Sequence, residues 1–480
     1  MKKNVLAKLL MMIGLIWAQP ASSLEYMDFG HVDIHGFLTQ GYMQSDKNNF
    51  FSETEDGTLQ FHEYGLNFSS EVTSNLRLGM QFFARDLGQI GNDEINVDWA
   101  YADYHYKDWL SMRVGKVKFP IGLYNKIRDM DMLRTWIILP QSIYNEAWRD
   151  IVSGASGFQL YGSIPFAGMI QYQGMFSTFE MKNNSGISLT IEDNIPFPFQ
   201  IEVQKNKVDN TYIGSLTWDT PISGLRLGQS YYQTSLDSYV THHQSVGATV
   251  DPILQKPITD SSGNFELYSW KQTGNQATLF NPSTKSTAYG TVINDPSSGK
   301  DVAIVLDPNN PFYFQTIAKI VDSGNQGVIR IKSFNMTSSI EYSWGEWIFD
   351  LEYASQKYNL KLQDLSEEEF YSLGYYAGLS YRLNEWMQLG GYYSEYYRDD
   401  EDKKGKKSWE TPILGNYRSW LKDSCLTLRF DFNEFWTLKL EGHQMNGAAW
   451  LLNADNLDDH GQPRYDKDWF LFATKLSYYF

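Results

Sequence analysis

The last twelve residues, 469–480, constrain the fold of this chain more than any other stretch. They read WFLFATKLSYYF. Side chains of a β-strand alternate between its two faces, so one face of this segment carries an almost continuous apolar row. That row consists of Phe470, Phe472, Thr474, Leu476, Tyr478 and Phe480. A terminal strand with one such face is expected to be buried, and a lipid-facing strand of a membrane barrel has this pattern. We therefore expect the segment to close a larger sheet.

Short turns divide the rest of the chain into strands of alternating pattern. Seven of them stand out, at 73–75, 107–109, 164–167, 220–224, 345–346, 384–385 and 433–434. Seven hairpins contribute fourteen strands, and a first strand at 32–44 together with the last segment makes sixteen. An even number of strands, with both ends on the side of the short turns, is typical of bacterial membrane barrels. The sequence thus predicts an all-β fold, a transmembrane antiparallel β-barrel of 16 strands.

The N-terminal segment indicates export. Residues 1–23 combine Lys2, Lys3 and Lys8 with a short apolar run and small residues at the end, as a signal peptide does. An uncleaved anchor helix is the alternative, but the apolar run is shorter than the ~20 residues that cross a membrane. We therefore expect a signal peptide at 1–23 and an outer-membrane barrel of a Gram-negative bacterium over 24–480. The single cysteine, Cys425, allows no disulfide framework.

Two connections between expected strands are too long for simple loops, and long connections usually carry function or structure. The third loop, expected at 120–155, is rich in apolar residues such as Met132, Trp136 and Ile137. Exposed to water these would form a costly patch, so we expect the loop to fold into the lumen and narrow it. The fifth loop, expected at 236–327, contains an extracellular hairpin around 295–299. It could instead be a small inserted domain or a partial plug.

Charged residues of both signs gather in the third loop and on the expected inner wall. For the constriction we expect Lys116, Lys118, Lys126, Arg128, Asp129, Asp131, Arg134, Glu146, Arg149 and Asp150. For the lumen wall we expect Arg77, Arg85, Asp103, Arg113, Arg382, Arg429, Asp431, Lys439 and Glu441. A mixed lumen favours a transverse field that orients polar solutes over a filter of one sign. The alternative is that many of these charges pair and only stabilise the interior.

With these features the chain resembles the sixteen-stranded outer-membrane porins. Many bacterial outer-membrane barrels also end in a strand with a terminal Phe. The run Gly115, Lys118, Pro120 and Gly122, spaced Gly-x-x-Lys-x-Pro-x-Gly, resembles the strand-to-loop junction of the phosphate-selective porin family. The resemblance implies a homotrimeric diffusion channel that its third loop constricts. That family selects phosphate with runs of Arg and a Lys cluster. Within the third loop, 120–155, four acids balance four bases, which departs from that pattern and puts phosphate selectivity in doubt.

The expected function is passive diffusion of small hydrophilic or charged solutes through a water-filled pore, with lipid and lipopolysaccharide around the barrel. No cofactor, metal site or catalytic residue is predicted, and with 57 acidic against 40 basic residues no nucleic-acid binding is expected. Three alternatives remain open. The fifth loop could make the barrel an adhesin or receptor, His105 or His443 could serve a barrel hydrolase, and the chain could be a soluble secreted all-β protein.

Overall fold

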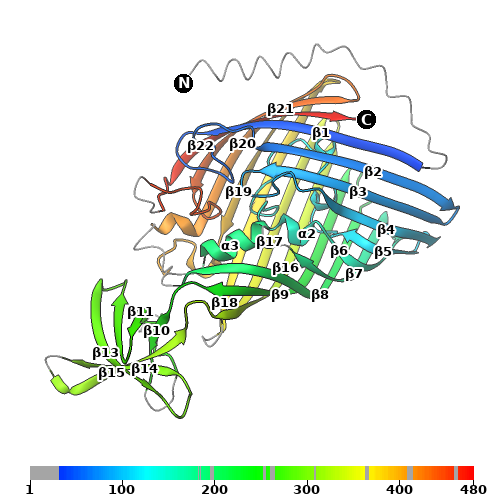
Figure 1. The fold of residues 1–480 in the computed structure, drawn as a ribbon. Coiled ribbons are helices and arrows are strands. Elements are labelled where there is room, and N and C mark those ends of the chain that lie inside the picture. Colours follow the sequence, from blue (N-terminus) through cyan, green and yellow to red (C-terminus); the bar gives the residue numbers. More distant parts are fainter. Residues whose placement is uncertain are drawn as a thin grey trace.

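The fold is a closed barrel of sixteen strands with a second, smaller barrel inserted between two of them (Figure 1). The computed structural model describes residues 32–181, 183, 185–194, 199–251, 256–259, 265–307, 310–362, 367–407, 415–458 and 463–480. The expected signal peptide therefore lies outside the described residues. None of the described helices is long and apolar enough to cross a membrane.

Each strand of the large barrel pairs antiparallel with the next, and the last pairs with the first. The strands are β1 (Val32–Ser45), β2 (Phe61–Thr73), β3 (Leu76–Leu87), β4 (Asn96–Lys107), β5 (Leu110–Lys118), β6 (Gly154–Pro165), β7 (Met169–Met181), β8 (Ile201–Asp219), β9 (Leu225–His242), β16 (Gln326–Trp344), β17 (Trp347–Leu362), β18 (Glu367–Asn384), β19 (Met387–Tyr397), β20 (Trp420–Asp431), β21 (Trp436–Gly447) and β22 (Asp468–Tyr479). The sixteen strands predicted from the alternating pattern are confirmed.

The two faces of the wall differ as the period of two requires. In β17, Phe349, Leu351 and Tyr353 are exposed on the outside. The residues between them, Asp350 and Glu352, are buried on the inside. An apolar exterior around a polar interior is the arrangement of a barrel in a lipid bilayer.

The C-terminal strand closes the barrel, as its sequence predicts. Leu38 of β1 is the direct partner of Tyr478 of β22. Beyond the paired strands, the amides of Gly36 and Phe480 each donate to the carbonyl of the other at 3.0 and 3.1 Å. No strand edge is left open at this seam, so the wall needs no other element to cover it.

The tight turns lie at one end of the barrel and the longer loops at the other, also as predicted. The turn between β16 and β17 has only two residues between the paired Trp344 and Trp347. Its first residue, Gly345, has φ +58°, which glycine adopts without strain. Several strands exceed the ~9–11 residues that span a bilayer, and β8 and β16 have 19 residues each.

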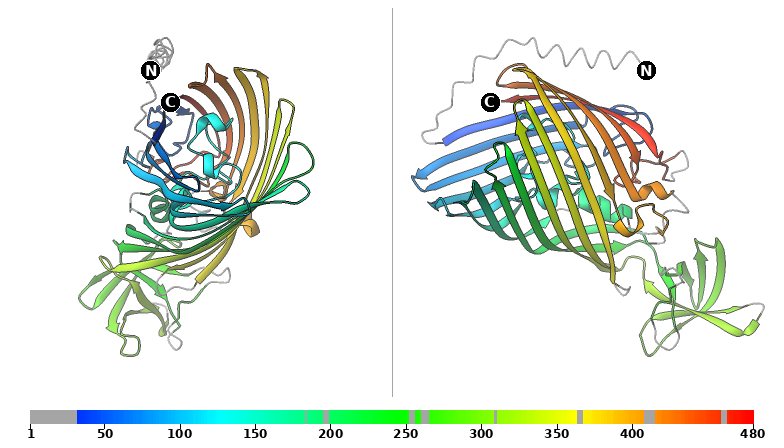
Figure 2. Two further views of the ribbon diagram at one scale, coloured as in Figure 1. Left: turned by 90° about the vertical axis from the view of Figure 1, so that its right-hand side faces the viewer. Right: turned by 180° about the vertical axis from the view of Figure 1, so that it is seen from behind.

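The fifth connection contains a separate closed barrel of six strands (Figures 1 and 2). These are β10 (Val246–Thr249), β11 (Leu267–Thr273), β12 (Gln276–Asn281), β13 (Ser286–Asn294), β14 (Asp301–Asp307) and β15 (Asn310–Val321). The hairpin expected around 295–299 is the β13–β14 hairpin. The connection itself is shorter than 236–327, because β9 continues to His242 and β16 begins at Gln326. Figure 2 shows the small barrel beyond the loop end of the large one.

Apolar clusters fill the loop end of the large barrel. One joins the first, third and eighth loops through Phe50, Phe51, Ile137, Ile138, Leu451 and Tyr465. A second packs two helices, α2 (Arg149–Val152) and α3 (Gly186–Asn194), against the wall. It also includes Val246 and Val321, so the base of the small barrel packs into the large one. Three-residue and four-residue 3₁₀ helices, η1 (Asn125–Ile127), η2 (Asp131–Leu133), η3 (Asp400–Asp402) and η4 (Asn416–Ser419), complete the described elements.

Candidate functional site

The third loop, residues 119–153, leaves β5 and runs inside the barrel, where it contacts opposite walls (Figure 2, cyan). Its inward turn depends on Gly122, which has φ +56°. A Cβ at this position would lie 2.4 Å from Tyr144 Oη and 2.7 Å from Glu352 Oε1, so only glycine fits. The next amide, that of Leu123, donates to the same Glu352 carboxylate at 2.9 Å. The predicted folding of this loop into the lumen is confirmed.

The wall of β21 holds the middle of the third loop through its backbone. Glu441 accepts from the amides of Ile137 and Ile138 at 2.6 and 2.9 Å. Two positions earlier on β21, the Lys439 ammonium donates to the carbonyls of Asp131, Arg134 and Trp136 at 2.7–3.2 Å. The side chain of Trp136, which lies between these anchors, is fully buried. The wall charges therefore fix the course of the loop.

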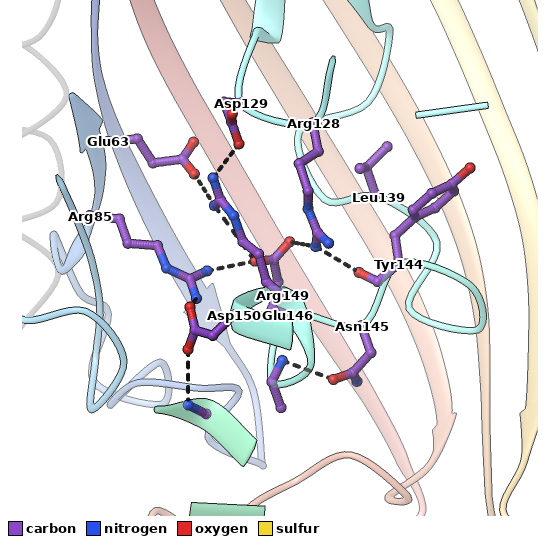
Figure 3. Close-up of polar contacts among 12 residues, drawn as sticks. Glu63, Arg85, Arg128, Asp129, Leu139, Tyr144, Asn145, Glu146, Arg149 and Asp150 are labelled. Carbon is purple, nitrogen blue, oxygen red and sulfur yellow. Dashed lines mark hydrogen bonds and ion pairs between the residues drawn. The ribbon is translucent and has the colours of Figure 1, made fainter. Parts of the chain in front are cut away.

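A network of ion pairs joins two further parts of the third loop, residues 128–129 and 146–149, to β2 and β3 (Figure 3). Arg149 contacts Asp129, and its guanidinium lies 2.6 Å from Glu63 of β2. Glu146 accepts from Arg128 at 2.7 Å and from Arg85 of β3 at 2.8 Å. These contacts alternate in sign, so each buried charge has an opposite neighbour.

Two further pairs extend this network across the seam of the barrel. Lys475 of β22 lies 2.5 Å from Glu63 and 3.1 Å from Asp131. Asp131 also pairs with Arg134 at 2.6 Å within the loop. A single charge network thus connects β2, the third loop and β22.

Opposite charges keep Asp129 and Glu146 of the third loop ionised. Burial by itself would raise the pKa of Asp129, but Lys118 and Arg149 outweigh it and hold that pKa well below its usual range. Burial opposes ionisation of Glu146 as well, and Arg128, Arg149 and Arg85 lower its pKa strongly. These two carboxylates therefore keep their ion pairs at acidities where an isolated carboxylate would be protonated.

A small cavity of about 40 Å³ lies within the network. Cations outnumber acids among the inward-facing residues that line it, which are Arg85, Arg128, Arg134, Arg149, Lys475, Glu63 and Glu146. The Nε atoms of Arg128 and Arg134 are buried and have no hydrogen-bond partner among the described residues.

Lys126 stands apart from this network. Its side chain is exposed inside the barrel, and no ion pair of Lys126 occurs among the described residues. The surrounding wall desolvates its ammonium group, and Arg113 repels it, so that the pKa falls to about 8. The charge of Lys126 therefore changes close to neutral pH.

The structure brings most of the expected constriction residues together. Lys118, Arg128, Asp129, Asp131, Arg134, Glu146, Arg149 and Asp150 are linked by ion pairs within one network. Lys116 forms no ion pair with this network among the described residues, although it lies only two positions before Lys118 on β5. Lys116 donates to the carbonyl of Val97 at 2.6 Å.

The expected lumen-wall residues fall into two groups. Arg85, Arg429, Lys439 and Glu441 contact the third loop and are buried. The others lie nearer the tight turns and pair along the wall: Arg113 with Asp103 at 2.9 Å, Arg382 with Asp431 at 3.3 Å, and Arg77 with Ser69 at 3.1 Å. Many lumen charges therefore neutralise one another, as expected if their role is to stabilise the barrel interior and not to create a transverse field.

Asp98 also belongs to the network and was not among the expected residues. It lies 3.2 Å from Lys118 and accepts from Gln81 at 3.1 Å. The register between β3 and β4 shifts between Gln81 and Phe82, and this bulge allows Asp98 to face inward. Alternation along the sequence gives no sign of such a shift. Only an irregularity in pairing could have identified Asp98.

The histidines proposed for a hydrolase do have polar partners. His443 lies 3.1 Å from Asp423 and 3.2 Å from Glu441, and its Nε2 is 4.0 Å from Cys425 Sγ. This group is buried under the third loop, so a substrate has no access to it in this arrangement. His105 is exposed near a tight turn and contacts the buried Ser111 at 3.0 Å through Nδ1.

Comparison with known proteins finds no matching family model and no curated relative. Solved structures with a similar course are an anion-selective porin from Comamonas acidovorans (10% identity, 94% of this chain and 99% of that chain, TM-score 0.48) and the outer-membrane protein OmpT of Vibrio cholerae (9%, 94% and 97%, 0.47). The outer-membrane channel DcaP of Acinetobacter baumannii is a third (8%, 94% and 97%, 0.46).

The strand order of the molecule itself defines its class. A closed sheet of sixteen antiparallel strands has an apolar exterior, short turns at one end and long loops at the other, with the third loop inside. These are the features of a bacterial outer-membrane barrel. The chain is a porin-like transmembrane β-barrel of the Gram-negative outer membrane.

Proposed function

We propose that this protein is an outer-membrane porin that lets small hydrophilic or charged solutes diffuse passively through its lumen and catalyses no reaction. The observation that carries the proposal is the charged third loop inside a closed barrel, anchored to β21 on one side and to β2 and β3 on another. A loop held in this way sets the width of any path past it. Pairing of most charges favours weak selectivity between ions.

The filled loop end makes the proposed channel narrow. Six connections, the first five and the eighth, contribute buried apolar residues to the clusters that occupy it. Residues nearer the tight turns, such as Asp103 and Arg113, remain half-exposed on the inner wall. We therefore expect small unitary conductance, set at the level of the third loop.

Reversal potentials in a salt gradient test this function. Arg128→Ala and Arg134→Ala each remove a cation that lines the small cavity, so selectivity should shift toward cations relative to the unmodified protein. Loss of one partner from a buried pair costs about 3–5 kcal/mol, so local loosening of the loop should also raise conductance.

Arg330→Ala is the matched control for that experiment. Arg330 pairs with Asp237 at 2.7 Å on the outward face of β16, away from the third loop. Its removal should leave selectivity unchanged. If both lumen variants behave like Arg330→Ala, the third loop does not control permeation.

A receptor or adhesin is a second candidate, because the small barrel exposes a row of large apolar residues. Leu306 and Phe314 are direct cross-strand partners, and Tyr289 lies on the adjacent β13; all three are mostly exposed. Contiguous apolar surface on a soluble part often marks a binding site. Cells that display a variant with Ser at all three positions should adhere less than wild type if this candidate is right, and equally if it is wrong.

The assembly that we propose is a homotrimer surrounded by lipid and lipopolysaccharide, as the porin resemblance implies. The mass of the purified protein in detergent, with the detergent contribution subtracted, tests it. Three chains per particle would support the trimer, and a single chain would rule it out under those conditions.

A further inference from the structure

Three potential metal ligands meet where the second loop returns to the wall. His62 of β2 and Asp86 of β3 are direct cross-strand partners. Both lie at the loop end of their strands, on the outward face that also carries Tyr64 and Phe82. Asp93 approaches from the second loop, and its Oδ1 is 2.7 Å from His62 Nε2. One possible ligand atom from each of the three residues lies within 4.8 Å of the other two.

The second loop holds Asp93 in a conformation that is unusual for its residue type. Asn92 and Asp93 have φ +46° and +58°, in the left-handed region that side chains other than glycine seldom adopt. The Asp93 amide donates to the Arg85 carbonyl at 3.0 Å, which fixes the loop against β3. The position of the Asp93 carboxylate is therefore set by the backbone.

Two ligand atoms of this group are buried without a partner. Asp86 is only 8% exposed, and its Oδ1 accepts no hydrogen bond from any described residue. The Nδ1 atom of His62 is likewise buried and has no hydrogen-bond partner among the described residues. A buried carboxylate oxygen without a donor costs free energy unless something else satisfies it. A cation bound between the three side chains would do so.

We propose that His62, Asp86 and Asp93 bind one divalent transition-metal ion of the Zn²⁺ type. An imidazole nitrogen with two carboxylate oxygens is a donor set that suits Zn²⁺, whereas Mg²⁺ and Ca²⁺ prefer oxygen alone. Tetrahedral Zn²⁺, with ligand distances of ~2.0–2.2 Å, separates neighbouring ligand atoms by about 3.3 Å. The side chains need to move little to reach that spacing. Asp93, with its side chain 57% exposed, gives the ion a route from solvent.

The second group of potential ligands in the described residues does not share these features. Cys425, Glu441 and His443 also lie within 4.8 Å of one another. Glu441, however, already accepts from two loop amides and from Thr427, and both ring nitrogens of His443 face carboxylates. That group is saturated and buried under the third loop, so a metal would have to displace existing bonds.

Zinc titration of the untagged, full-length protein in detergent tests the proposal. Isothermal titration calorimetry should show one Zn²⁺ bound per chain. His62→Ala and Asp93→Asn should each weaken binding by more than the roughly 10- to 100-fold that loss of an outer-shell partner costs. Asp93 lies in an exposed loop, so Asp93→Asn is expected to fold even if a change at Asp86 prevents folding.

His243→Gln is the matched control. His243 pairs with Glu202 at 3.2 Å on the surface, but among the described residues no third potential ligand atom lies within 4.8 Å of both. Its replacement should leave zinc affinity unchanged. Equal affinity in wild type, His62→Ala and Asp93→Asn would overturn the proposal, as would displacement of Zn²⁺ by an equal concentration of Mg²⁺ or Ca²⁺.

Discussion

At the scale of single residues, the lumen contains charges that are buried yet individually compensated. Asp131 is the clearest case, because Arg134 and Lys475 both approach its carboxylate while Ser477 donates to it at 2.9 Å. A carboxylate buried without such partners would be protonated or would disrupt the fold. Compensation of this kind explains how one loop can carry four acids and four bases inside a barrel.

Lys126 is the exception, and it predicts a pH dependence of permeation. Because its pKa is lowered to about 8, the ammonium is charged below that pH and neutral above it. Raising the pH from 7 to 9 should therefore shift the selectivity toward cations, with a midpoint near 8. Reversal potentials measured across this range in a fixed salt gradient give the titration directly.

Two variants make this prediction specific. Lys126→Met should abolish the change between pH 7 and 9. Lys357→Met should preserve it, because Lys357 pairs with Glu369 at 2.6 Å on the outward face of β17, away from the third loop. A wild-type titration that survives in Lys126→Met would assign the effect to another group.

Parity along a strand predicts many of these residues but not all of them. The inward placement of Arg85, Lys439 and Glu441 follows from the alternation of β3 and β21. Alternation does not separate Lys116 from Lys118, which are two positions apart, although only Lys118 forms ion pairs with the network. Asp98 was missed because a bulge, which has no signature in the side-chain pattern, turns it inward.

At the scale of elements, the third loop depends on its anchor at β21. Glu441→Ala removes the acceptor of two buried amides, and each hydrogen bond to a charged group contributes about 1.5–3 kcal/mol. The loop should therefore lose about 3 kcal/mol or more of local stability and sample open positions. Larger or noisier unitary conductance is the expected result.

Cys425 provides a second readout for that variant. It is the only cysteine of the chain and is buried in a cluster with Trp136 and Leu139 of the third loop. Thiol-reactive probes should label it faster in Glu441→Ala than in wild type. Glu341→Ala is the control, since Glu341 pairs with Arg226 at 3.3 Å on the inner wall of β16. Equal labelling in all three proteins would contradict the anchoring role of Glu441.

The elements of the large barrel could be predicted from the sequence, and those of the small one mostly could not. Strands at a lipid surface need a strict period of two, so turns such as 345–346 are visible between alternating runs. Strands such as β10, with four buried residues in succession, have no such alternation. The loop ends of β9 and β16 also lack the alternation, because charged residues such as Arg330 stand on the outward face there in place of apolar ones. The pattern therefore does not predict how far these two strands extend.

At the scale of the whole molecule, the large barrel should be independent of most of the insertion. β9 and β16 pair directly from Leu225 to Thr241, so the wall is continuous without it. Thr249 of β10 lies opposite Ile317 of β15, and a two-residue turn can therefore join them. Replacing residues 250–316 with Asn-Gly retains Val246 and Val321, which pack into the large barrel.

This shortened protein should fold, show the same shift in mobility on heating that we expect of the full-length protein, and conduct with the same unitary steps. Electrophoresis of heated and unheated samples, followed by bilayer recording, checks both points. A shortened chain that no longer folds would show that the small barrel is needed for the large one. Unchanged conductance together with lost cell adhesion would assign the insertion to the receptor role.

Conductance of the purified full-length protein in a planar lipid bilayer is the most direct test of a water-filled passage through the barrel. The proposed function predicts discrete, uniform steps of small size that scale with salt concentration. Protein that demonstrably inserts into the bilayer, yet leaves it electrically silent at every salt concentration and voltage, would contradict a diffusion channel.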